Sequence, residues 1–108
     1  MRTDDPTLGL FPERRMTVFT TPRVNVVQSD EGFEVEVLGR TGLAYREGVR
    51  QVRADSEALN RPGAMMMYAQ SLRSWSDGAS ISDEERRHIV DNITRAFLSQ
   101  GWELVVVP

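Results

Sequence analysis

The chain has 108 residues, a length typical of one domain, and its 40% hydrophobic and 27% charged residues are ordinary for a globular protein. It has no cysteine, which excludes disulfides and thiolate zinc sites, and no stretch approaches the ~18 apolar residues that a membrane-spanning helix needs. The net charge of −3 argues against nucleic acid as the ligand, because phosphate binding needs a basic surface.

Residues 1–15 are predicted to form a flexible arm, and residues 16–108 a single domain. Pro6, Gly9 and Pro12 interrupt any regular pattern in the arm. The arm contains no apolar run of signal-peptide length, so we expect a cytoplasmic protein. A short strand is predicted to follow the arm and to end before Pro22, because a proline restricts the residue that precedes it.

Two antiparallel strands are predicted next. Apolar residues alternate with glutamates over residues 33–37, which is the pattern of a half-buried strand with one apolar and one acidic face. The turn-forming sequence between the strands predicts a four-residue loop that pairs Val26 with Val35 and Val24 with Val37.

A second hairpin follows, with a two-residue turn at Glu47-Gly48. This turn places Leu43 opposite Val52 and Tyr45 opposite Arg50. Together the two hairpins are predicted to form a four-stranded antiparallel meander, with one apolar face and one face in contact with water.

Three methionines in a row mark the segment at residues 64–75, where the apolar spacing fits either a strand or a helix. Because the segment lacks a helix-capping signal, we expect a strand over residues 64–69 and a helical turn over residues 70–75. Tyr68 and Leu72 are predicted to lie in the core. Trp75 stands just before a polar loop, where we expect it to be partly exposed. It is either a tryptophan at the edge of the core or an anchor for a partner protein.

A helix is predicted over residues 83–100. Ser82 and Glu85 match the capping-box pattern, and Gly101 stands where a left-handed C-terminal cap is needed. Asp91 precedes Arg95 by four residues, the favourable order for a surface ion pair. One apolar stripe runs along this helix, formed by Ile89, Ile93, Ala96 and Phe97.

The sequence WELVVV after the helix is predicted to be a final strand, and its unbroken valines predict cover on both faces. The order of elements indicates an α+β fold. We expect an antiparallel β-meander sheet that is packed by one C-terminal α-helix, followed by the final strand.

Few residues could carry chemistry. His88 is the only histidine, and its position on the helix predicts a surface residue, with Glu84 one turn earlier within reach for a pair. No local motif places a nucleophile beside it. We therefore predict a non-catalytic protein without metal or cofactor.

Two carboxylate pairs stand on the predicted sheet, Glu34 with Glu36 and Asp55 with Glu57. Such pairs could hold a divalent cation or act as an acid–base couple, so a small enzyme or cation-binding domain is one alternative. Loop spacings typical of a cation site are absent. We interpret these residues as a solvated sheet face.

Several segments resemble a family of known proteins. These are YREGVRQVRADSEAL, then MYAQSLRSW, then ISDEERRHIVDNITRAFLSQGWELVV. Together they resemble the immunity protein 74 family, which are small α+β immunity proteins of bacterial polymorphic toxin systems. The likeness covers about residues 33–106. The likeness lies in the overall layout of these segments more than in any single diagnostic motif.

The resemblance implies an inhibitor that binds a cognate toxin domain and neutralises it without catalysis. It points to an interface that includes Trp75, Asp77, Asp55, Arg73 and Tyr68. The other alternative is a structural or adaptor module that self-associates, for example as a homodimer, through edge strands and the methionine run.

Overall fold

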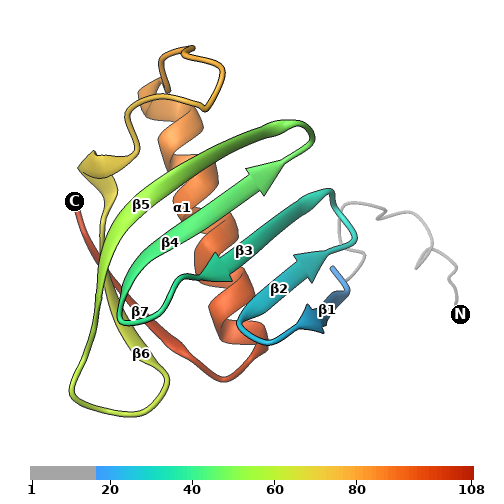
Figure 1. The fold of residues 1–108 in the computed structure, drawn as a ribbon, viewed down its shortest axis with the longest axis vertical. Coiled ribbons are helices and arrows are strands. Elements are labelled where there is room, and N and C mark those ends of the chain that lie inside the picture. Colours follow the sequence, from blue (N-terminus) through green and yellow to red (C-terminus); the bar gives the residue numbers. More distant parts are fainter. Residues whose placement is uncertain (1–16) are drawn as a thin grey trace, which may run out of the picture.

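The computed structural model describes residues 17–108, which form one curled seven-stranded sheet and one helix (Figure 1). The predicted arm lies outside the described residues. The strands follow the chain order across the sheet, antiparallel from β1 to β6, and β7 is parallel to β6. The elements are β1 (Phe19–Arg23), β2 (Val26–Ser29), β3 (Phe33–Val37), β4 (Thr41–Glu47), β5 (Arg50–Ala58), β6 (Ala64–Tyr68), α1 (Asp83–Ser99) and β7 (Glu103–Val107). The α+β prediction is confirmed at this level.

Helix α1 begins and ends where the local signals predict. The Ser82 hydroxyl accepts a hydrogen bond from the Glu85 N–H at 3.1 Å, and the Glu85 carboxylate accepts from the Ser82 N–H at 3.0 Å. Gly101 has a φ of +73°, as a left-handed cap requires. Asp91 pairs with Arg95 at 3.4 Å. The predicted capping box, surface pair and C-terminal cap are all confirmed.

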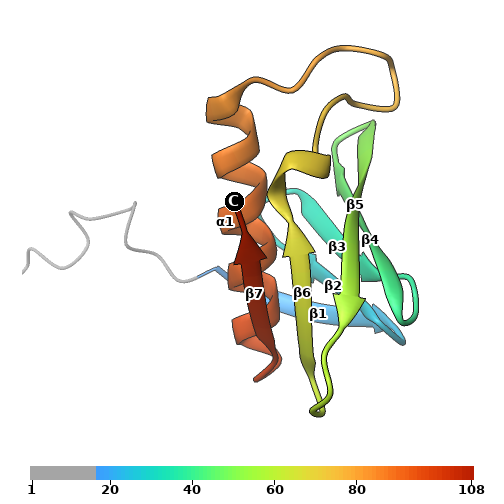
Figure 2. The same cartoon turned by 90° about the vertical axis from the view of Figure 1, so that its left-hand side faces the viewer.

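The core lies between α1 and the inner face of the sheet (Figure 2). The predicted helix stripe is buried, because Ile89, Ile93 and Ala96 are fully covered and Phe97 is 2% exposed. It packs against side chains from β2 to β6, including Val27, Val35, Leu43, Tyr45 and Met67. Burial of each such large side chain stabilises the fold by roughly 1.5–3 kcal/mol.

The β2–β3 register differs from the prediction by one residue. Val27, not Val26, lies opposite Val35, because the turn has three residues and ends at Gly32 with a φ of +100°. Val24 is no strand residue: it belongs to the turn between β1 and β2 and is 87% exposed. The prediction fails because an alternating pattern does not set the length of a turn.

The β4–β5 turn is a two-residue turn at Gly48-Val49, one residue later than predicted. Tyr45 therefore lies opposite Val52, and Leu43 lies opposite Ala54. This shifts the pairing by two residues. Because side chains alternate with a period of two, the predicted core faces of both strands are nevertheless correct.

Strand β1 contradicts the prediction that it ends before Pro22, because it continues to Arg23. The β1–β2 register shifts between Thr20 and Arg23. Since β1 is an edge strand, a proline without an N–H can be accommodated there.

The predicted strand at residues 64–69 is confirmed as β6. The helical turn that follows is a single 3-10 turn, Ala69–Ser71, shorter than predicted. Met65 and Met67 are buried, whereas Met66 and Tyr68 on the other face are half-buried. The prediction of Tyr68 as a core residue is therefore wrong, whereas Leu72 is fully covered as predicted.

Within residues 17–108, strand β7 forms the second edge of the sheet and pairs with β6 only. Its last four residues are half-buried. The prediction of full cover on both faces is wrong: Leu104 and Val106 pack against the core on one face, and all four residues stay partly exposed. No helix in the described part of the chain is long and apolar enough to cross a membrane.

Candidate functional site

Trp75, the residue with two open interpretations, belongs to the core. Its side chain is 6% exposed, so the expectation of partial exposure is wrong. The indole lies 6.3 Å from the Tyr45 ring, centroid to centroid, and the Arg50 guanidinium stacks 4.6 Å above it. An indole that is covered on both sides cannot reach a partner without opening the core.

The Trp75 indole has one unusual feature, a buried Nε1 that makes no hydrogen bond of standard geometry among the described residues. The nearby Glu85 carboxylate has a lowered pKa, first because the Ser82 backbone N–H donates to it. The indole N–H contributes to the same lowering of the pKa. We interpret this contact as electrostatic, because it falls outside hydrogen-bond geometry.

Asp77 lies in the loop before α1 and ties that loop to β5. Its carboxylate accepts from the Arg50 Nε at 3.1 Å and from the Ala79 N–H at 2.9 Å. The Ala79 hydrogen bond and the Arg50 charge lower the pKa of Asp77. The carboxylate therefore holds the loop in place.

The other predicted interface residues lie elsewhere. Asp55 and Tyr68 line a depression of about 350 Å³ on the outer face of the sheet, where the Tyr68 hydroxyl donates to Glu57 at 3.4 Å. Arg73 is exposed, and its Nε donates to the Gln70 carbonyl oxygen at 3.4 Å. The structure thus does not bring the five predicted residues together at one depression.

A buried polar cluster that the sequence did not indicate joins β4 to α1. The Tyr45 hydroxyl donates to Glu47 at 2.6 Å and accepts from the Asn92 amide at 2.8 Å. Burial, followed by the Glu47 hydrogen bond, raises the pKa of Tyr45 well above its usual range. Because Tyr45 is fully covered, its phenol stabilises the fold and cannot reach a substrate.

His88 lies at the rim of this cluster. Its Nε2 is 3.1 Å from the Asn92 amide nitrogen and 3.6 Å from Glu47, whereas no hydrogen bond or ion pair joins it to Glu84. The Glu47 contact is possible because the β4–β5 hairpin reaches the helix, which helical spacing does not indicate.

The Glu34–Glu36 pair on the sheet is not a free cation site. Arg46 bridges Glu34 and Glu36, with 2.7 Å between its Nη2 and the Glu36 carboxylate. Among residues 17–108, no three histidine or acidic side chains come together in a way that could hold a metal ion.

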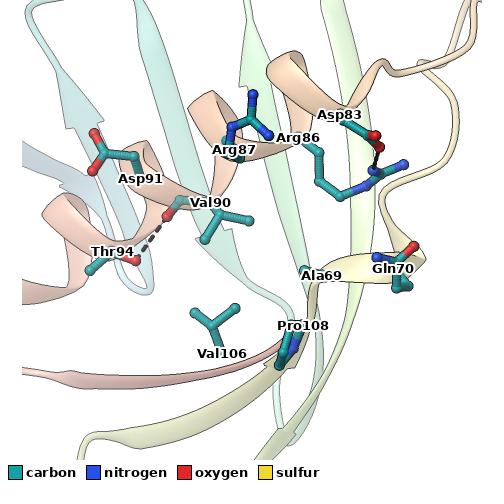
Figure 3. Close-up of a pocket in the computed structure, with 10 residues that line it drawn as sticks. All are labelled: Ala69, Gln70, Asp83, Arg86, Arg87, Val90, Asp91, Thr94, Val106 and Pro108. Carbon is teal, nitrogen blue, oxygen red and sulfur yellow. Dashed lines mark hydrogen bonds and ion pairs between the residues drawn. The ribbon is translucent and has the colours of Figure 1, made fainter.

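A groove of about 610 Å³ lies between α1 and the end of β7 (Figure 3). We call it the α1–β7 groove. Its apolar surface is formed by Ala69 of the 3-10 turn, Val90 of α1, Val106 of β7, and Pro108, which follows β7. Polar and charged residues surround this surface, namely Gln70, Asp83, Arg86, Arg87, Asp91 and Thr94.

Most charges around the α1–β7 groove are already paired. Arg86 binds Asp83 at 2.5 Å and the Leu72 carbonyl oxygen at 3.2 Å, and Asp91 pairs with Arg95. Arg87 is the exception, because within residues 17–108 no group accepts a hydrogen bond from it or forms an ion pair with it. The groove therefore combines an apolar surface with one available cation.

The sequence analysis missed this groove. The helical wheel places Arg87 away from the buried stripe and Val90 at the margin of the stripe, next to Phe97. The position of β7 beside α1 makes the surface around them concave. Comparison of the chain with protein-family models, curated proteins and solved structures gives no match. The resemblance to the immunity protein family therefore stays a prediction from the sequence.

Proposed function

We propose that this protein is an immunity protein that binds a toxin domain in the cytoplasm of the producing cell and neutralises it without catalysis. The resemblance of residues 33–106 to the immunity protein 74 family is the first support. The structure adds a surface with the character of a protein interface.

One observation carries the proposal: the α1–β7 groove lies beside a strand edge with which no strand in residues 17–108 pairs. Val90 and Val106 contribute to its apolar surface, and charged side chains surround it. An apolar centre with a polar rim is the usual anatomy of a protein interface. A free strand edge adds unpaired backbone groups that a partner can bind.

Co-expression with a toxin tests the proposal. The probe is the C-terminal domain of a large secreted protein encoded next to this gene, induced in a host that it kills. This protein should restore growth and co-purify with the domain. Normal killing in the presence of folded, expressed protein, with no complex on gel filtration, would refute the proposal.

A second function has a specific observation in its favour. The free edge of β7 could pair with the same edge of a second copy, which would make the protein a self-associating module. Sedimentation at micromolar concentration tests this second function. A protein that is strictly monomeric at that concentration would refute self-association.

A further inference from the structure

The backbone of β7 presents hydrogen-bonding groups to the open edge in a definite pattern. The Glu103 N–H donates to the Gly63 carbonyl oxygen at 2.8 Å, so Glu103 points its backbone groups toward β6. Backbone groups of successive strand residues point to alternate sides. Leu104 and Val106 therefore direct their N–H and C=O groups away from β6, to the open edge.

The open edge and the α1–β7 groove are continuous. Val106 contributes both its outward backbone groups and a side chain in the apolar surface of the groove. A strand added beside β7 would have alternate side chains directed toward the α1 surface around Val90. Apolar side chains at those positions would fill the groove.

The charges around the groove select the partner. Arg87 is the groove cation that has no hydrogen-bond or ion-pair partner within residues 17–108, and the Gln70 amide lines the same groove. A second copy of β7 brings only Glu103, whose carboxylate is already bound by Arg61 at 2.9 and 2.8 Å. A different chain with a free carboxylate fits better than a second copy.

We propose that β7 takes up an extended segment of a partner protein as an eighth strand. Its backbone pairs with Leu104 and Val106, its apolar side chains enter the α1–β7 groove, and an aspartate or glutamate binds Arg87. This inference rests on the proposed function, since it names how the neutralised protein would be bound.

A phage-displayed library of random dodecapeptides is the probe. Selection on the folded protein should enrich peptides in which apolar residues alternate and at least one acidic residue is present. Binding of a selected peptide should slow amide hydrogen exchange at Leu104 and Val106. No enrichment, or enriched peptides that leave these two amides unchanged, overturns the inference.

Two variants test the contacts separately. Val106→Pro removes an outward N–H together with the valine side chain in the groove, and it leaves the β6–β7 hydrogen bonds intact, because proline is tolerated where a strand N–H faces outward. Arg87→Glu reverses the available charge. Each should weaken peptide binding roughly tenfold or more, the effect expected when hydrogen bonds or an ion contact are lost.

Arg40→Glu is the matched control, because Arg40 is exposed, lies outside the groove and changes the net charge equally. Equal weakening by Arg40→Glu and Arg87→Glu overturns the charge contact. If the Val106→Pro variant does not fold, amide hydrogen exchange on the wild-type protein tests the backbone contact instead. The wild-type protein and the folded Val106→Pro and Arg87→Glu variants are then compared in the growth assay. If all three restore growth equally well, this docking mode is overturned, but the proposed function is not. Loss of rescue by the wild-type protein refutes the proposed function.

Discussion

Replacement of Trp75 tests whether this residue holds the core together. The side chain is 6% exposed and lies between Tyr45 and Arg50. Truncation of a buried tryptophan to alanine costs about 3–5 kcal/mol. A domain of this size has a free energy of unfolding of about 5–15 kcal/mol, so Trp75→Ala should remove a large part of its stability.

Trp75→Phe should behave differently from Trp75→Ala. It keeps an aromatic ring in the core and removes the buried Nε1, which makes no hydrogen bond of standard geometry within residues 17–108. Leaving such a donor unsatisfied costs about 1–3 kcal/mol, and its removal offsets part of the packing that is lost. We expect the phenylalanine variant to lie within about 1.5 kcal/mol of the wild-type protein.

Urea denaturation followed by far-ultraviolet circular dichroism measures both variants. With a slope of about 1–3 kcal/mol per molar urea, Trp75→Ala should move the midpoint by more than about 1 M. Val49→Ala is the control, because Val49 is fully exposed and its loss should change stability by less than about 0.5 kcal/mol. If Trp75→Ala shifts the urea midpoint no more than this control does, the core assignment of Trp75 is wrong.

Three further predictions concern the helix cap and the buried polar cluster. Ser82→Ala should lower the free energy of unfolding by about 1 kcal/mol in urea titrations, because the capping hydroxyl is lost; an unchanged midpoint would contradict this. The lowered pKa of Glu85 stabilises the fold above the ordinary value of 4.5, and this stabilisation is lost as the pH falls through the folded-state pKa. Glu85→Gln should therefore flatten the acid limb of a stability–pH profile, and a profile that superimposes on the wild type would argue against it. The raised pKa of Tyr45 stabilises the fold fully below pH 10, and this stabilisation is lost as the pH rises further. Tyr45→Phe should reduce the alkaline loss of stability seen in thermal melts, whereas an equally steep loss would place the titrating group elsewhere.

Local signals predicted the elements well. The helix followed from the capping box at Ser82, the apolar stripe and Gly101, all of which act within a few residues of one another. The alternation over residues 33–37 predicted β3 correctly, because one face of a half-buried strand must be apolar. The core faces of Tyr45 and Val52 were also correct, although their pairing was shifted.

Pairing between strands was less predictable, because it depends on how many residues each turn uses. A three-residue turn in place of a four-residue turn exchanged Val26 for Val27 opposite Val35. An alternating pattern fits several turn lengths equally well. The choice is made by how the strands pack together over α1.

The sequence by itself determined the fold class, the helix and the faces of most strands, since these depend on patterns within one element. Only the tertiary structure decided that Trp75 closes the core, and that β7 becomes an open edge beside α1. Both outcomes depend on contacts between residues far apart in the chain. The α1–β7 groove exists for the same reason, because Ala69, Val90 and Val106 share a surface only after the sheet has curled around the helix.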